Sequence, residues 1–168
     1  MSTQSTAVAP AQTRAGKYLT FFLAGEEYGL EILKVSEIIG MQDITRVPRT
    51  PTFVRGVINL RGKVIPITDL RVKFGMDNSS NEESCIIVVQ MRDVQTGIVV
   101  DRVSEVVALA EEDIADSPEF GAGVQTDLLL GIGKSGDRVK LLLDIDRVLE
   151  AADLSTLAEA VGSIPATA

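Results

Sequence analysis

Alternating apolar and polar residues predict that most of this chain forms short β-strands. The segments YLTFFL (18–23), YGLEI (28–32) and CIIVVQM (85–91) are rich in the β-branched and aromatic residues that favour strands, and AGEE forms a turn between the first two. LKVSEIIG (33–40) fits either a helix or a strand. The polar segment GMDNSSNEES (75–84) is typical of a linker or a long loop.

A β-hairpin is predicted over GVINLRGKVIPITDL (56–70), with Arg61 and a glycine at its turn. Thr50 stands before Pro51, the order of an N-cap and a first helical proline, so a one-turn helix is expected there. Asp69 can cap a second short helix, LRVKF. The hairpin alone does not decide whether Arg61 is a solvated turn residue or the centre of a site.

The chain also repeats itself in four ordered blocks, which favours an ancient duplication. GLEILKVSEII (29–39) aligns with GIVVDRVSEVV (97–107) at an offset of 68 residues, and the same offset places YLTFFL over IIVVQM. TPTF meets SPEF at an offset of 67, and KVIPITDL meets RVKLLLDI at 75. Because VSEVVAL is strongly β-favouring, VSEIIG is expected to be mainly strand as well, entered by a helical turn at Ile32–Lys34.

Each copy then holds about five short strands, which close most easily into a small barrel because closure removes exposed edges. We expect a first repeat at about 17–75 and a second at about 84–150, and strands could also be exchanged between the barrels. The two barrels should pack together and leave a groove between them. Residues 1–16 are expected to be a disordered tail, and 151–168 a C-terminal helix or tail.

Composition narrows the class of protein. The net charge of −8 argues against binding to nucleic acid or to an anionic membrane surface. The single cysteine, Cys85, excludes an internal disulfide framework and suits a reducing compartment. No signal peptide is seen, and no apolar run approaches the roughly 18 residues of a membrane span. A cytoplasmic protein without direct membrane insertion is therefore expected.

Catalytic chemistry finds little support in the residues. The chain has no histidine, which removes the commonest general base and metal ligand, and we expect no catalytic residues, no metal and no cofactor. GIGKSG (131–136) lacks the first glycine and the following helix of a phosphate loop. Cys85 borders an apolar run and fits a core position. The function is therefore predicted to be binding.

The long motifs EEYGLEILKVSEI, TPTFVRGVINLRGKVIPITDLR and GIVVDRVSEVV resemble the CheW family of bacterial chemotaxis coupling proteins, from about residue 17 to 150. The resemblance implies a mainly β fold of two tandem SH3-like five-stranded β-barrels with short helices. It also implies a non-catalytic adaptor that links the cytoplasmic tips of chemoreceptors to the histidine kinase CheA. Such an adaptor is cytoplasmic and is recruited to receptor arrays at the membrane.

The resemblance also indicates two binding surfaces. The groove residues are expected to face the receptor, with a Glu37–Arg61 pair beside apolar side chains: Ile32, Val35, Glu37, Ile38, Arg61 and Val99. The kinase-facing surface is expected at Ile44, Arg46, Val47, Thr50, Phe53 and Gly56, although Gly56 can also serve backbone geometry alone. The bland alternative for Glu37 and Arg61 is the wet face of an edge strand. The alternative function is an enzyme or small-ligand-binding protein with a site in the inter-barrel groove.

Overall fold

The computed structural model describes residues 14–73, 82–91, 94–116 and 128–149. The expectations for residues 1–13, for most of the linker, for the SPEF block and for the C-terminal segment fall outside these ranges. Arg14–Gly16, assigned above to a disordered tail, are instead held against the second half of the chain. The Arg14 guanidinium donates to Glu111 and Asp116, and the Tyr18 hydroxyl donates to the Arg14 carbonyl at 2.6 Å.

Strands dominate the described residues, and the helices are single turns. The first half contains β1 (Gly16–Leu23), β2 (Glu26–Glu31), the 3-10 turn η3 (Ile32–Lys34), β3 (Val35–Gly40), β4 (Val54–Leu60), β5 (Lys63–Asp69) and α1 (Leu70–Lys73). The second half contains β6 (Cys85–Met91), β7 (Val94–Val100), β8 (Arg102–Leu109), η4 (Glu111–Asp113), β9 (Ile114–Ala115), β10 (Leu129–Ser135), β11 (Arg138–Leu143) and α2 (Ile145–Val148). No helix in the described ranges is long and apolar enough to cross a membrane.

The element order repeats as the sequence predicts. An offset of 75 residues carries β4 onto β10, β5 onto β11 and α1 onto α2, since Val54 meets Leu129 and Leu70 meets Ile145. An offset of 68 carries β1, β2 and β3 onto β6, β7 and β8 to within about one residue. The ambiguous segment 33–40 is therefore strand after a helical turn, as its β-branched counterpart indicates.

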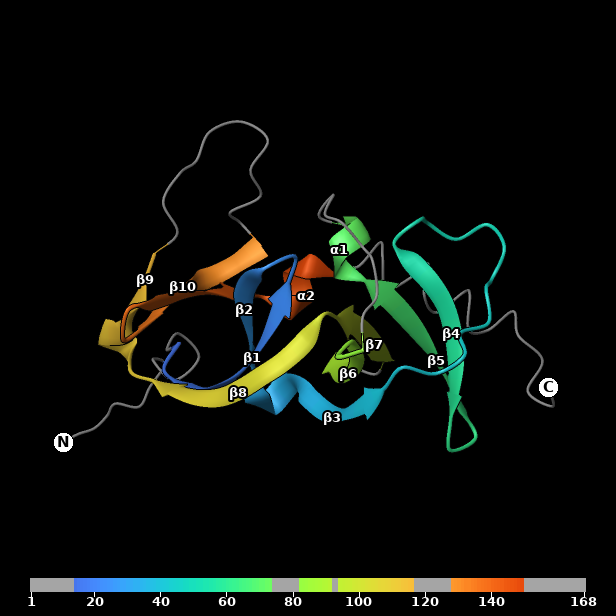
Figure 1. The fold of residues 1–168 in the computed structure, drawn as a ribbon, viewed down its shortest axis with the longest axis horizontal. Coiled ribbons are helices and arrows are strands. Elements are labelled where there is room, and N and C mark those ends of the chain that lie inside the picture. Colours follow the sequence, from blue (N-terminus) through green and yellow to red (C-terminus); the bar gives the residue numbers. More distant parts are fainter. Residues whose placement is uncertain (1–13, 74–81, 92–93, 117–127, 150–168) are drawn as a thin grey trace.

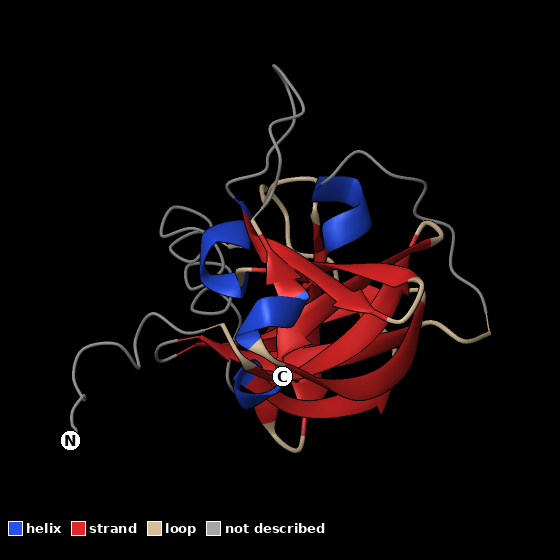
Figure 2. Cartoon of the chain, turned by 90° about the vertical axis from the view of Figure 1, so that its left-hand side faces the viewer, coloured by secondary structure: helices blue, strands red, loops and turns tan. Residues whose placement is uncertain are grey.

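The strands form two sheets, each built from both repeats. One sheet has the order β8-β1-β2-β11-β10-β9, and the other has the order β3-β6-β7-β5-β4. The first two strands of each repeat thus lie in the sheet that holds the last strands of the other repeat. Viewed from one end, the strands form a single rounded body with the short helices at its periphery (Figure 2).

The short crossovers explain this exchange. In both sheets the antiparallel pairings give β3 the direction of β7 and β8 the direction of β2. If one repeat closed its own barrel, β2 and β3 would be parallel with β1 between them, a connection that needs about a dozen residues. The crossover Ile32–Lys34 has three residues, and Asp101 alone separates β7 from β8. Each crossover can therefore only lead into the other sheet.

Two glycines that the repeats share have a packing role at the exchanged junctions. β2 and β11 are parallel, with Gly29 beside Leu142, and β7 and β5 are parallel, with Gly97 beside Ile67. A Cβ atom would lie 2.9 Å from Leu142 Cδ2 at Gly29, and 2.5 Å from Ile67 Cδ1 at Gly97. The identity of these positions in the two copies therefore follows from equivalent close contacts between repeats.

The exchange also produces a core that the two sheets share. Its buried side chains come from both sheets and both short helices, and include Phe21 and Leu30 from one sheet and Ile87 and Ile98 from the other. Smaller clusters belong to one sheet each. The expected space between the barrels is therefore filled largely by this shared core.

The prediction of a helix at Thr50–Pro51 is wrong. Residues 50–53 form a turn, in which the Val54 amide donates to the Pro51 carbonyl at 3.0 Å. The Thr50 hydroxyl does not cap a helix but donates to the Val47 carbonyl at 2.9 Å. The N-cap pattern failed because β4 starts immediately after the turn and leaves no residues for a helix.

Candidate functional site

Arg61 occupies a turn position that a side chain rarely adopts. Leu60 pairs with Lys63, so Arg61 and Gly62 form a two-residue loop in which both have positive φ, 53° and 86°. These values belong to a type I′ turn, whose first position favours Asn, Asp or Gly over arginine. The Asn59 side chain accepts from the Gly62 amide at 2.7 Å and closes the turn.

The predicted pair of Glu37 and Arg61 is confirmed. The two Arg61 terminal nitrogens donate to the two Glu37 carboxylate oxygens, one of them at 3.3 Å and the other closer. The hydrogen bond to Glu37 raises the pKa of the Arg61 guanidinium. The pair joins the β4–β5 hairpin to β3, although these strands lie at opposite edges of one five-stranded sheet.

This pair has no counterpart in the second repeat. Glu105 on β8 is equivalent to Glu37, but the turn position equivalent to Arg61 is Gly136, 75 residues later. A solvated turn residue would need no partner in either copy. The bidentate pairing in one copy alone therefore favours a site over the bland reading of Arg61.

Apolar side chains lie on the same segment as Glu37. Leu33, on η3, is 93% exposed, and Ile38, on β3, is 45% exposed. Ile32 and Val35 are half-buried and pack against the shared core. Leu33 is absent from the sequence-based set because its apolar partners in the strand pattern, and not the exposed turn, were used to choose it.

Val99 does not belong to this surface. It is fully buried on β7, in the cluster enclosed by the five-stranded sheet, so its inclusion among the groove residues was wrong. Val99 pairs with Asp69 of β5 and with Ile86 of β6, which places it in the middle of the sheet. A central strand with both faces covered shows the same apolar run as a groove wall.

The η3 crossover is held from the other repeat. Lys34 Nζ lies 2.9 Å from Asp146 Oδ2 on α2, and hydrogen bonding to Asp146 raises the pKa of Lys34. Glu31 lies nearby, and its pKa is raised by burial and by the charges of Asp144 and Asp146, against the lowering effect of Lys34. The exposed apolar turn is thus fixed to α2 by an ion pair.

The predicted kinase-facing residues lie on the segment between β3 and β4. Thr45 bridges to Val57 by two backbone hydrogen bonds of 2.8 and 2.9 Å. Gly56, with φ 140°, allows this approach, because a Cβ there would lie 2.1 Å from the Thr45 carbonyl oxygen. Gly56 is buried and therefore serves backbone geometry, while Phe53 is half-buried against the shared core.

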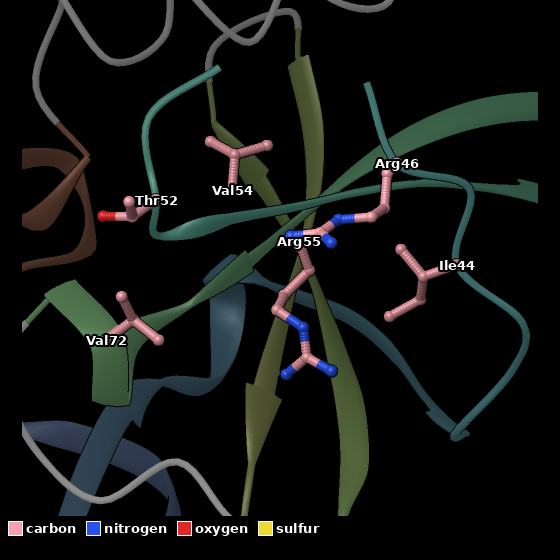
Figure 3. A pocket seen from close by; sticks show the side chains of 6 residues that line it. All are labelled: Ile44, Arg46, Thr52, Val54, Arg55 and Val72. Atoms are coloured by element: carbon pink, nitrogen blue, oxygen red, sulfur yellow. The ribbon is translucent and has the colours of Figure 1, made fainter. Parts of the chain in front are cut away.

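A two-lobed pocket opens beside β4. Its lobes have volumes of about 470 and 480 Å³ and share Arg46, Thr52, Val54 and Arg55. Arg46 extends into it from the β3–β4 segment, and Val54 and Val72 contribute apolar walls (Figure 3). The pocket thus combines apolar walls with guanidinium groups, and lies beside one sheet rather than between the barrels.

A buried ionic network that the sequence did not reveal lies next to this pocket. Arg71 is fully buried and binds the Asp69 carboxylate through two nitrogens, each at 2.9 Å. Arg71 also donates to Asp101 at 2.6 Å, and Arg55 donates to Asp69 at 2.8 Å. The motif DLR was interpreted only as a helix cap; a charged residue two positions after a buried aspartate was the available signal.

The site offers no catalytic group. Burial raises the pKa of the Cys85 thiol, which keeps the sulfur protonated and in its expected core role. Across the described ranges, no group of three or more Cys, Asp or Glu side chains could hold a metal ion. GIGKSG lies on β10 and its turn, so no helix follows its lysine. These surfaces are suited to contact with a macromolecule.

Comparison with known proteins identifies the family. The model of the CheW-like domain matches residues 17–153. The chain belongs to the CheW-like family. It is similar to the chemotaxis protein CheW of Klebsiella aerogenes, with 42% identity over 145 residues that cover 86% of this chain and 87% of that protein. The chemotaxis protein CheW of Thermotoga maritima is 33% identical over 135 residues, covering 79% and 86% of the two chains.

A solved member of the CheW-like family has the same fold. The crystal structure of the scaffolding protein TtCheW from Thermoanaerobacter tengcongensis superposes with a TM-score of 0.75 at 35% identity, and covers 83% of this chain and 90% of that one. The fold is therefore mainly β with two SH3-like domains, as predicted. The family is one of chemotaxis scaffolding proteins and not of enzymes.

Proposed function

We propose that this chain is a non-catalytic adaptor that couples chemoreceptors to the histidine kinase CheA in bacterial chemotaxis. The observation that carries the proposal is the Glu37–Arg61 pair beside the exposed Leu33 and Ile38. Open apolar side chains beside a fixed ion pair suit recognition of one face of a helix, and receptor tips are helical hairpins. An enclosed pocket would instead favour the enzyme alternative.

Two faces of the molecule are assigned to two partners. The receptor tip contacts η3, β3 and the β4–β5 turn, and the regulatory domain of the kinase contacts the β3–β4 segment. The protein is cytoplasmic in this proposal and reaches the membrane arrays through the receptors. The separation of the two faces supports it, because an adaptor must hold both partners at once.

Reconstitution tests the proposal. The full chain, a receptor cytoplasmic fragment and CheA are combined, and receptor-dependent kinase activity is measured. Ile38→Asp should weaken receptor binding, because it places a charge in an apolar contact, and should leave kinase binding unchanged. Arg61→Ala should do the same without lowering the melting temperature, because its ion pair is exposed to solvent.

Val139→Asp provides the matched control, since Val139 is a 54% exposed apolar residue on β11, away from both faces. Equal loss of receptor binding in Ile38→Asp and Val139→Asp would contradict the assigned receptor face. Equal loss of both partners in Ile38→Asp would contradict the division into two faces. Absence of any receptor-dependent kinase activity with the unmodified chain would contradict the adaptor function itself.

A further inference from the structure

The pocket beside β4 is basic in an acidic protein. Three arginines surround it, Arg46, Arg49 and Arg55, although the whole chain has a net charge of −8. Arg55 is neutralised by Asp69, at 2.8 Å. Arg46 and Arg49 are exposed, and no ion pair of either is seen within the described ranges. Two uncompensated guanidinium groups therefore border a pocket with apolar walls.

Arg49 is held in a conformation that a side chain seldom adopts. Its φ is 65°, in the left-handed region where glycine and asparagine are favoured. The neighbouring Pro48 and Pro51 and the hydrogen bond from Thr50 to Val47 restrict the loop around it. Strain of this kind is found where a side chain is used for binding, and here it presents a cation at the pocket.

The equivalent part of the second repeat carries the opposite charge. Thr45 bridges Val57, and Ala115 pairs with Ile132, the residue 75 positions after Val57, so Arg46 and Asp116 occupy equivalent positions. η4, which precedes them, is Glu111–Asp113, with three consecutive acidic residues. β9 and β4 lie at opposite ends of the long axis (Figure 1), so the molecule has a basic end and an acidic end.

From this complementarity we propose that the pocket beside β4 binds a pair of carboxylates that flank an apolar side chain, at the acidic end of a barrel in the regulatory domain of the kinase. Arg46 and Arg49 bind the carboxylates, and the walls formed by Ile44, Val54 and Val72 receive the apolar side chain. Guanidinium groups suit this role because they bind carboxylates through two hydrogen bonds. This inference rests on the proposed function and names the chemistry of its kinase-facing surface.

The charge pattern of this chain supplies the template for the ligand. Its own acidic end places Glu111 and Glu112 next to the apolar Ile114. The resemblance implies that the kinase domain is a double barrel of the same construction, so its corresponding end is the occupant to which the proposal commits. A second copy of this chain is the competing occupant, and the experiment separates the two.

The test compares two double variants of the full chain. Arg46→Glu with Arg49→Glu should weaken binding of the purified kinase regulatory domain by roughly tenfold or more, because the carboxylates would meet like charges. Lys17→Glu with Lys134→Glu makes the same change in net charge at two exposed lysines on β1 and β10, and should leave the affinity within about twofold of the unmodified chain. Raising the salt concentration should weaken the unmodified chain more than the arginine variant.

Arg46→Lys adds a graded readout. It keeps the charge and loses the two-point hydrogen bonding, so its affinity should fall between those of the unmodified chain and the double variant. Equal affinities of the two double variants would overturn the inference while leaving kinase binding, and thus the proposed function, intact. Absence of kinase binding by the unmodified chain would overturn both.

Sedimentation equilibrium of the chain alone addresses the competing occupant. The proposal expects the arginine substitutions to change kinase binding and to leave the association state of the isolated chain as it is. If they abolish self-association and do not affect kinase binding, the pocket binds a second copy and the proposal is overturned. The melting temperature of both double variants shows that a change in binding does not come from unfolding.

Discussion

At the scale of single residues, the marked positions separate into surface and buried ionic chemistry. The exposed pair of Glu37 and Arg61 could be predicted from the sequence because both residues interrupt apolar strands in which a charge has no packing role. The buried pair of Asp69 and Arg71 could not, because two residues in one short motif do not show that both are enclosed. Burial depends on strands from the other repeat, which the local sequence does not specify.

Asp69→Asn should strongly destabilise the fold. The carboxylate lies between Arg71 and Arg55, and its loss leaves the fully buried Arg71 charge compensated only by Asp101. Breaking a buried ion pair in this way costs about 3–5 kcal/mol. Urea denaturation at neutral pH measures the loss, and Asp137→Asn, at an exposed turn, is the control that should leave the free energy of unfolding unchanged.

The same residue predicts a dependence on acid. Burial alone would raise the pKa of Asp69, but the hydrogen bonds and charge of Arg71, together with Arg55, lower it overall. A lowered pKa in the folded state contributes stability above the ordinary aspartate value of about 3.9, and that contribution is lost as the pH falls below it. The difference in stability between the unmodified chain and Asp69→Asn should therefore shrink in acid, and a constant difference would contradict the charged role.

At the scale of elements, strands and crossovers followed from periodicity and the repeat, whereas turns did not. The segment 33–40 was settled by its copy, and the strand boundaries agree with the predicted blocks. The Thr50–Pro51 pattern predicted a helix, but the backbone there is committed to the approach of Thr45 to β4. Val99 was placed on a surface because an apolar strand residue looks the same in a groove wall and in a covered sheet.

Gly56→Ala should separate the β3–β4 segment from β4. The added Cβ would meet the Thr45 carbonyl carbon and oxygen at 2.7 and 2.1 Å, and φ is 140°. The strained backbone and the clash should together cost roughly 1–3 kcal/mol, and kinase binding should fall with the displaced segment. Thermal denaturation and binding assays measure both effects.

Gly40→Ala is the control for that substitution. Gly40 ends β3, has no positive φ, and has open space where its Cβ would lie. Its stability should stay within about 0.5 kcal/mol of the unmodified chain. If Gly56→Ala behaves like Gly40→Ala, the close approach of Thr45 does not constrain the loop.

At the scale of the whole molecule, the shared core makes the two sheets one cooperative unit. Leu30 is fully buried on β2 and packs in the core that both sheets enclose. Leu30→Ala should lower the free energy of unfolding by about 2–5 kcal/mol. Hydrogen exchange should therefore accelerate for the slowest amides of both sheets alike, because neither can keep its structure after the other opens.

Leu33→Ala is the control for cooperativity, since Leu33 is 93% exposed and contributes little to the core. It should leave exchange in both sheets unchanged. Acceleration restricted to the sheet of β2 after Leu30→Ala would show that the barrels open independently. The exchange of strands that produces this coupling was left open by the sequence, because periodicity identifies strands but not their neighbours.

The three-residue crossover Ile32–Lys34 has a consequence for the history of the fold. A chain of one repeat with so short a crossover could not fold its first hairpin back onto its own last strands. It could close barrels only in pairs, with each copy lending its hairpin to the other across a twofold axis. Joining the end of one such copy to the start of the next would convert that symmetric pair into a single chain without altering a contact. Once joined, the two halves could diverge, and Arg61 facing Gly136 and Arg46 facing Asp116 are differences that no symmetric ancestor could have had.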